Sequence, residues 1–289
     1  MRCPSRRGNV RFANLECGGH AAALSDNESG SMAAALQMPK ITFSSDPNAY
    51  RITLNDPPLH ILDLALLEDL RDALGRVAAD RHALIIDATG DKAFSAGASV
   101  QDHLGDRVVT MLQRFHECFR MLAKLDIITV ALVKGVALGG GCELALACDF
   151  VLASDRARFG QPEINLGVFP PVAAYQLSRQ LAPRKGLELL LSGDPIDAAE
   201  AERHGLINAV FPLAEFDARC EAWLKRIYKQ SASSLRFAKR AFRLAQSADF
   251  DERLAKVERL YLEELMKTDD ANEGLNAFLE KRKPAWKGH

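Results

Sequence analysis

The sequence lacks an excess of charge of either sign. Lys and Arg together number 37 against 38 Asp and Glu, which gives the 289 residues a formal net charge of -1. No block of like charges interrupts this balance, so electrostatics provide little drive for binding nucleic acid or an anionic membrane surface. We therefore expect a protein whose partner is neither a polyanion nor a membrane.

The sequence also lacks a hydrophobic run that is long enough to cross a bilayer. The longest apolar runs, such as Ile127–Val133, are far shorter than the ~20 residues of a transmembrane helix. No hydrophobic segment of a secretory signal peptide follows Met1. These two observations predict a cytoplasmic protein.

Cysteines are few and show no pairing pattern. The six lie at positions 3, 17, 118, 142, 148 and 220, without a C-x-x-C pair or a neighbouring histidine at the spacing of metal ligands. Neither a zinc site nor a disulfide framework is expected from this distribution. A chain of this size buries roughly 70 to 75% of its unfolded surface without such a crosslink. We expect buried thiols in a reducing compartment and no bound metal.

Composition divides the chain into three parts. Residues 1–39 begin with several arginines and continue as a Gly, Ser, Asn and Ala mixture without periodicity, which predicts a disordered leader. Acidic residues within it argue against an organellar transit peptide, and a functional start at Met32 or Met38 fits as well. We expect a catalytic core over 40–230 and a C-terminal helical region over 231–289.

The apolar pattern from Ile41 onward predicts an α/β core. Ile41–Leu54 contains two short runs typical of a hairpin, and Asp63 begins an amphipathic helix with leucines at helical spacing. Buried strands are expected at Ala83–Ala88 and Ile127–Val133, and this alternation of strand and helix is typical of an α/β fold. The remaining expected elements are a loop at Ala93–Val100, helices at about Val108–Leu125 and Gly140–Ala147, a short strand at Ile207–Phe211, and helices at Arg236–Ala245, Leu254–Met266 and Glu273–Lys281.

Two segments of small residues offer backbone N–H groups to a ligand. Residues 93–99 (AFSAGAS) form a turn directly after a strand, in which small side chains leave the N–H groups unshielded. Residues 139–141 (GGG) begin a helix whose first N–H groups have no partner within the helix. Together the two segments can donate two hydrogen bonds to one oxygen. A phosphate loop is the weaker interpretation, because no Lys-Ser or Lys-Thr follows and the G-x-G-x-x-G spacing fails at Leu144.

Two glutamates accompany these segments. Glu143 lies in the first turn of the helix after the triplet, and Glu163 ends a Gln-Pro-Glu turn. Alone, Glu143 is also explained by the helix dipole and Glu163 by a surface turn. As a pair, one ionised carboxylate can take a proton from water while the other, protonated, delivers a proton to carbon. Such a pair titrates as a unit.

The order and spacing of these segments, followed by Gly167–Pro171, resemble the crotonase superfamily and in particular the enoyl-CoA hydratases. The resemblance covers about residues 41–289. It implies a spiral of β-β-α units that make two sheets, with C-terminal helices that assemble homotrimers or hexamers. The implied reaction is the addition of water to a C=C bond conjugated with a CoA thioester. No cofactor is implied beyond the CoA of the substrate.

The same resemblance implies roles for individual residues. The N–H groups of Ala98 and Gly140 form the oxyanion hole, where removing one donor typically costs about 10² to 10³ in rate. Glu143 positions and deprotonates the water, and Glu163 handles the proton at the α-carbon. Contacts to CoA or to the acyl group are implied for Ala96, Ser99, Val100, Gln101 and Phe169.

The sequence departs from the common hydratase pattern at two places. Ser99 stands where the family often has Asp, and residues 169–174 (FPPVAA) replace a Pro-Gly-x-Gly-Gly-Thr run. With residues 231–236 and 261–266, these variants resemble cyclohexa-1,5-dienecarbonyl-CoA hydratases. The narrower resemblance implies a cyclic dienoyl-CoA substrate of aromatic degradation and an acyl pocket that is not the standard one for straight chains.

Other activities on the same scaffold stay open at this point: a general enoyl-CoA hydratase, a double-bond isomerase or a ring-opening hydrolase of cyclic CoA esters. Both glutamates are retained, which favours hydration. A cluster of Arg236, Lys239, Arg240 and Arg243 raises RNA binding as a different class of function. Acidic residues follow this cluster at once, so a solvated helix face is the preferred interpretation.

Two further side chains lie close to the predicted site. His103 is near enough to the first segment to line an acyl pocket. Cys142, next to Glu143, is either a nucleophile or a small buried residue, and the second interpretation is preferred.

Overall fold

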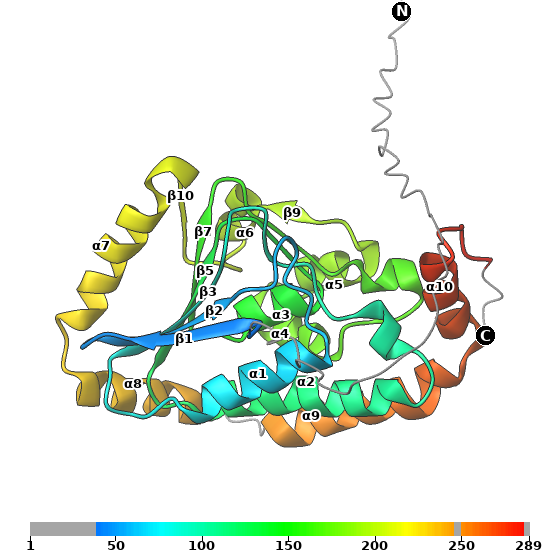
Figure 1. Cartoon of the computed structure of the whole chain (residues 1–289), viewed down its shortest axis with the longest axis horizontal. Helices are drawn as coiled ribbons and strands as arrows, with labels where there is room; N and C mark the ends of the chain where they lie inside the picture. Colours follow the sequence, from blue (N-terminus) through cyan, green and yellow to red (C-terminus); the bar gives the residue numbers. More distant parts are fainter. Residues whose placement is uncertain (1–38, 246–249, 286–289) are drawn as a thin grey trace, which may run out of the picture. The chain divides into compact units, whose positions relative to one another are not determined.

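Two β-sheets form the frame of the computed structural model, which describes residues 39–245 and 250–285 (Figure 1). The larger sheet has six strands in the order β1-β2-β3-β5-β7-β10, and the smaller has four in the order β4-β6-β8-β9. The expected α/β fold with two sheets is therefore confirmed. The predictions of a disordered leader and of buried thiols at Cys3 and Cys17 lie outside the described residues.

Five of the six strands of the larger sheet lie where strands were predicted, whereas β7 was not predicted. They are β1 (Ile41–Ser45), β2 (Ala49–Leu54), β3 (Ala83–Ala88), β5 (Ile128–Val133), β7 (Phe150–Ser154) and β10 (Ala209–Phe211). β1 and β2 form the expected antiparallel hairpin, in which Ile41 lies opposite Leu54. All later pairs in this sheet are parallel, so helical connections must carry the chain back between strands.

The smaller sheet consists of short strands that the sequence pattern does not predict. They are β4 (Ala93–Ser95), β6 (Val136–Leu138), β8 (Arg158–Gly160) and β9 (Ile196–Asp197). The expectation of a loop over Ala93–Val100 was wrong at both ends, because β4 begins it and a 3-10 helix, η1 (Val100–His103), ends it. Strands of two or three residues are too short for an alternation of apolar and polar side chains to appear.

Helices pack around the two sheets. They are α1 (Leu64–Gly75), α2 (Arg107–Lys124), α3 (Gly140–Leu146), α4 (Pro171–Gln180), α5 (Pro183–Ser192), α6 (Ala198–Arg203), α7 (Phe216–Tyr228), α8 (Ala232–Ala245), α9 (Phe250–Arg259) and α10 (Asp269–Leu279). Asp63 caps α1 as predicted, since its side chain accepts a 2.9 Å hydrogen bond from the N–H of Leu66. No helix in the described ranges is long and apolar enough to cross a membrane.

The expected continuous helix over Leu254–Met266 is interrupted. α9 ends at Arg259 and is followed by a π-helical turn, η4 (Leu260–Glu264), and a 3-10 turn, η5 (Leu265–Lys267). A π-helical turn inserts one residue per turn and so changes the direction in which later side chains point. The apolar spacing seen in the sequence shows that this stretch is covered, but it does not show the change of helix type.

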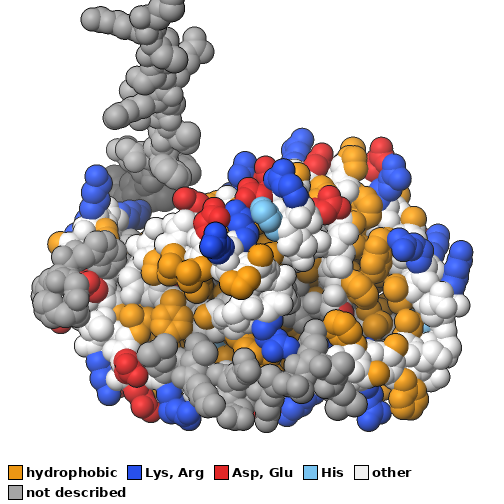
Figure 2. All heavy atoms as spheres, turned by 180° about the vertical axis from the view of Figure 1, so that it is seen from behind, with side chains coloured by type: hydrophobic (Ala, Val, Ile, Leu, Met, Phe, Trp, Pro, Cys, Tyr) orange, Lys and Arg blue, Asp and Glu red, His pale blue; other side chains and the backbone are white. Residues whose placement is uncertain are grey.

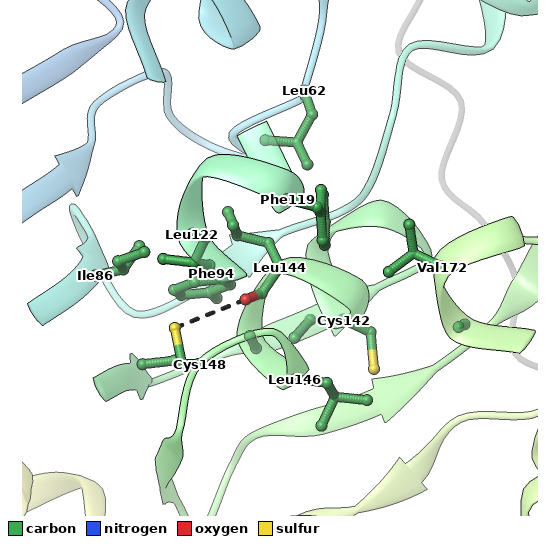
Figure 3. Close-up of a cluster of buried hydrophobic side chains, with 14 of the residues drawn as sticks. Leu62, Ile86, Phe94, Phe119, Leu122, Cys142, Leu144, Leu146, Cys148 and Val172 are labelled. Atoms are coloured by element: carbon green, nitrogen blue, oxygen red, sulfur yellow. Dashed lines mark hydrogen bonds between the residues drawn. The ribbon is translucent and has the colours of Figure 1, made fainter. Parts of the chain in front are cut away.

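The hydrophobic core surrounds the short helix α3. Each residue of α3, from Gly140 to Leu146, is buried, and Leu144 lies in one cluster with Phe94 and Phe119 (Figure 3). Just beyond the helix, the Cys148 thiol donates a 3.8 Å hydrogen bond to the Leu144 carbonyl, drawn as a dashed line in Figure 3. Tight packing on every side holds α3 in one place, and with it any functional group at its first turn.

Candidate active site

The two segments of small residues lie against each other at the start of α3. β4 and β6 are parallel neighbours in the smaller sheet, so the turns that follow them meet at the same edge. A Cβ atom added to Gly140 would lie 3.2 Å from the Ala98 nitrogen, and Gly97 has a φ of +103° that favours glycine. Among the described residues, no acceptor pairs with the N–H of Ala98 or of Gly140. Two adjacent N–H donors are thus available to one ligand oxygen.

The third predicted segment packs against the same glycines. β8 pairs with β6, and the N–H of Gly139 donates a 2.9 Å hydrogen bond to the Gly160 carbonyl. The 3-10 helix η2 (Pro162–Leu166) follows β8 and carries Glu163 back toward α3. A Cβ atom on Gly139 would come within 2.2 Å of Glu163 Oε1, so the carboxylate fills the space that a side chain would occupy.

Glu143 is held by the segment that departs from the hydratase pattern. Its side chain is almost fully buried, and Oε1 accepts a 2.6 Å hydrogen bond from the N–H of Ala173 in the first turn of α4. Gln176, one turn later, donates a 3.0 Å hydrogen bond from Nε2 to the Glu143 carbonyl. Sequence reasoning expected residues 169–174 to alter the acyl pocket, but it did not anticipate that they also anchor this glutamate.

Burial changes the acidity of both glutamates. Loss of solvation raises the pKa of Glu143 and of Glu163, and the negative charge of Glu163 raises the pKa of Glu143 further. Glu163 Oε2 is buried and has no hydrogen-bond partner within the described part of the chain. Raised pKa values allow one carboxyl to be protonated while its neighbour is ionised, which is the state that paired acid and base catalysis requires.

A cavity of about 420 Å³ opens in front of these groups. Seven of the predicted site residues line it: Ala96, Ala98, Val100, Gly140, Glu143, Glu163 and Phe169. Ser99 and Gln101 do not line it, although contacts to the ligand were expected from both. The chain turns into η1 at this point, and the Gln101 side chain is exposed.

Other walls of the cavity come from helices that sequence reasoning did not connect with the site. Met111, Leu112 and Phe115 reach it from α2, and Leu275 and Phe278 reach it from α10. The sequence predicted helices at about Val108–Leu125 and Glu273–Lys281, but not that their apolar side chains line a cavity. Only the tertiary structure shows that these side chains form walls of the cavity.

The two further side chains considered near the site differ in their roles. His103 lines the cavity as anticipated; its Nδ1 lies 2.8 Å from the Ser99 carbonyl, and burial lowers its pKa, which favours the neutral imidazole. Cys142 lies in the core instead, beside Leu146 and Val172 (Figure 3). Burial raises the pKa of its thiol, which stays protonated and is a poor nucleophile.

The basic cluster on α8 is partly buried, which corrects the expectation of a solvated face. Lys239 is only 8% exposed and pairs with Asp149 at 2.5 Å, while Arg243 donates a 2.6 Å hydrogen bond to the Ala123 carbonyl. These side chains fasten α8 to the core and are not available to RNA. No group of three or more His, Cys, Asp or Glu side chains in the described residues has the arrangement of a metal site.

Comparison with known proteins gives a consistent result. Residues 46–289 match the family model described as enoyl-CoA hydratase/isomerase. The chain is 40% identical over 259 residues to cyclohexa-1,5-dienecarbonyl-CoA hydratase of Thauera aromatica, covering 88% of this chain and 99% of that protein. It is 35% identical over 258 residues to 2,3-dehydroadipyl-CoA hydratase of Escherichia coli, covering 87% of this chain and 100% of that protein.

Solved structures with a similar fold are also acyl-CoA hydratases. A carnitinyl-CoA hydratase from Mycobacterium avium is 32% identical with a TM-score of 0.75, over 87% of this chain and 99% of that one. An enoyl-CoA hydratase from Mycobacterium avium subsp. paratuberculosis is 26% identical with a TM-score of 0.76, over 86% of this chain and 98% of that one.

Proposed function

Since the chain belongs to the enoyl-CoA hydratase/isomerase family and is a hydro-lyase acting on acyl-CoA, we propose that its substrate is cyclohexa-1,5-dienecarbonyl-CoA. The observation that carries hydration is the pair of glutamates, Glu143 buried and Glu163 half-buried with a buried Oε2, that line one cavity beside two unpaired N–H donors. The 40% identity to the Thauera aromatica hydratase supports the cyclic diene.

In this proposal the thioester carbonyl oxygen accepts hydrogen bonds from the N–H groups of Ala98 and Gly140. Glu143 takes a proton from a water molecule as its oxygen attacks the electrophilic carbon of the conjugated system. The electron pair moves onto the thioester oxygen, where the two donors stabilise the enolate. Glu163 then gives its proton to carbon, which completes the addition of one water.

The two carboxyl groups divide this work by protonation state. Their raised pKa values favour one shared proton near neutral pH, so that a base and an acid coexist in the same cavity. Hydration changes no oxidation state overall and both proton transfers have a protein group, so we propose that CoA is required only as part of the substrate.

The shape of the acyl pocket supports a cyclic acyl group. Phe169 stands edge to face with Tyr261, with ring centroids 5.4 Å apart, and both rings line the cavity. Flat apolar walls of this kind complement the face of an unsaturated six-membered ring. The contacts proposed for Ala96 and Val100 place the CoA end of the substrate beside the first segment.

Related activities remain the alternatives to this proposal. Similarity to 2,3-dehydroadipyl-CoA hydratase supports the first alternative, a general hydratase of open-chain acyl groups. An isomerase would move a proton between two carbons without adding water, and a ring-opening hydrolase would add water and cleave the ring. RNA binding is not retained, because the α8 cluster is partly buried.

We also propose a cytoplasmic homotrimer or hexamer. Figure 2 shows hydrophobic side chains (orange) gathered in patches on one face of the molecule. Among the exposed large apolar residues, Phe237 and Phe242 on α8 are each 66% exposed, as expected of a surface that a second copy covers. The free, buried Cys118, Cys142, Cys148 and Cys220 fit a reducing compartment.

The test is a turnover assay with crotonyl-CoA and cyclohexa-1,5-dienecarbonyl-CoA in parallel, followed by the mass gain of one water. We expect a strong preference for the cyclic diene, and a loss of about 10² or more in kcat for Glu143→Gln and Glu163→Gln. The exposed Glu221→Gln is the matched control and should keep full turnover. Preference for crotonyl-CoA would return the chain to the general hydratases, and unchanged turnover in both variants would contradict the two-glutamate mechanism.

A further inference from the structure

The phenol of Tyr261 is a buried polar group that no protein atom satisfies. The side chain is 1% exposed and lines the cavity, and its hydroxyl has no hydrogen-bond partner among the residues that the structure describes. A hydroxyl that is buried without a partner destabilises the folded protein. The Tyr261 hydroxyl lies in the wall of the cavity, so a molecule bound there can provide the missing hydrogen-bond partner.

A complementary unpaired group lies in the same cavity. Glu163 Oε2 is also buried without a partner in the described part of the chain. Burial and the charge of Glu163 both raise the pKa of Tyr261, so the phenol stays protonated and is a hydrogen-bond donor. The cavity therefore presents one unused donor and one unused acceptor, which together match a group that both accepts and donates.

Packing alone does not require the hydroxyl. The ring of Tyr261 contacts Phe169 edge to face at 73°, and a phenylalanine ring would make the same contact. The residue lies in the π-helical turn η4, a distortion that often marks a functional site and that here directs the side chain into the cavity.

We propose that Tyr261 is a specificity-determining residue whose phenol donates a hydrogen bond to the hydroxyl oxygen of the hydrated acyl group, while Glu163 accepts from the same hydroxyl. In the forward direction the same oxygen belongs to the attacking water. The inference rests on the proposed hydration. It predicts that the site binds a hydroxyacyl-CoA more tightly than the saturated acyl-CoA of the same skeleton, which has only C–H at that carbon.

The experiment compares Tyr261→Phe with the wild-type protein by measuring Kd for two ligands, a hydroxyacyl-CoA product and the saturated acyl-CoA of the same carbon skeleton. Tyr261→Phe should weaken binding of the hydroxyacyl-CoA about tenfold, which is typical of one lost hydrogen bond, and leave the saturated ligand unchanged. Tyr175→Phe is the matched control, since Tyr175 also packs edge to face on a phenylalanine but does not line the cavity.

Thermal unfolding provides a second readout. Tyr261→Phe removes an unsatisfied buried hydroxyl, so its Tm should equal or exceed that of the wild-type protein. Equal weakening of both ligands, or of neither, would overturn the role of the phenol. So would a wild-type protein that binds the two ligands equally well, a measurement that needs no variant.

The outcomes separate this inference from the proposed function. A wild-type protein that hydrates enoyl-CoA but loses no selectivity in Tyr261→Phe would overturn the inference alone. A wild-type protein that hydrates no enoyl-CoA and favours no hydroxyl ligand would overturn both.

Discussion

Gly139 shows how a single residue without a side chain positions a carboxylate. Its φ of +51° and the position of Glu163 Oε1, 2.2 Å from where a Cβ would lie, both demand glycine. The glycine triplet therefore does more than free the N–H groups at the start of α3. It also makes room for the second glutamate.

Gly139→Ala should displace Glu163 and lower kcat by about 10² or more, since a misplacement of about 1 Å in a catalytic group costs that much. Gly90→Ala is the matched control, because Gly90 also has a positive φ, +76°, but has no atom within 4 Å of the added methyl. Both variants carry backbone strain, and only the first should lose activity. Steady-state kinetics alongside thermal unfolding check this, and equal losses of activity in both would show that strain alone is responsible.

The buried carboxylates should make stability fall as pH rises. The folded pKa of Glu163 is raised above its ordinary value of 4.5, so its contribution to stability is fully present below that pH and is lost as pH rises through the folded pKa. Glu163→Gln cannot ionise there. Its Tm should therefore match the wild type in acid and exceed it increasingly as pH rises above 4.5, as followed by thermal unfolding. A difference that stays constant with pH would contradict a raised pKa.

Elements with a sustained pattern could be predicted from the sequence. The hairpin of β1 and β2, the helix α1 capped by Asp63 and the strand β3 each place apolar residues at a regular interval over five residues or more. β4, β6, β8 and β9 are too short for such a pattern, and neighbouring strands rather than local preference define them.

The helix α9 is held beside α2 by a partly buried network of hydrogen bonds and an ion pair (Figure 1). Glu258 Oε1 lies 2.6 Å from His116 Nδ1, and Arg120 donates a 2.9 Å hydrogen bond to Glu258 Oε2. His116 is fully buried, so loss of the carboxylate would leave a polar ring without its partner. This network fixes the end of α9, from which η4 carries Tyr261 into the cavity.

Glu258→Ala should lower the free energy of unfolding by about 1 to 3 kcal/mol, the cost of leaving a buried polar group unpaired. It should also raise KM, because the wall that Tyr261 forms is less well fixed. Urea unfolding and initial rates measure the two effects. Glu264→Ala, at an exposed position in the same region, is the control and should change neither.

At the scale of the whole molecule, the candidate site combines residues that are far apart in the sequence. Glu143 and Glu163 could be predicted because each lies within a recognisable segment. Phe115 and Leu275 could not, since their neighbours in the chain carry no sign of a ligand and only folding brings them to the cavity. Tyr261 begins the stretch 261–266 of the narrower resemblance, but that resemblance gave it no role in the site. Local pattern thus indicated the chemistry, whereas the shape of the acyl pocket required the tertiary structure.

Assembly should depend on the exposed phenylalanines of α8. Phe237→Glu combined with Phe242→Glu places charges on the surface proposed for contact with a second copy and should shift the protein toward monomers. Analytical ultracentrifugation measures this directly. Arg219→Glu, at an exposed position on α7, is the control that should keep the assembly. A double variant that assembles like the wild type would exclude this face as the contact.

The anchoring of Glu143 by the N–H of Ala173 has a consequence for redesign of the enzyme. Phe169, Pro170 and Pro171 line the cavity, and Ala173 in the same stretch holds Glu143, the proposed base. A library aimed at new substrates through this stretch would therefore put turnover at risk in every member. Leu275 and Phe278 of α10 also line the cavity, and in the described part of the chain neither has a hydrogen bond to Glu143. Directed evolution of substrate range is therefore better started from α10, where selectivity and turnover can be changed separately.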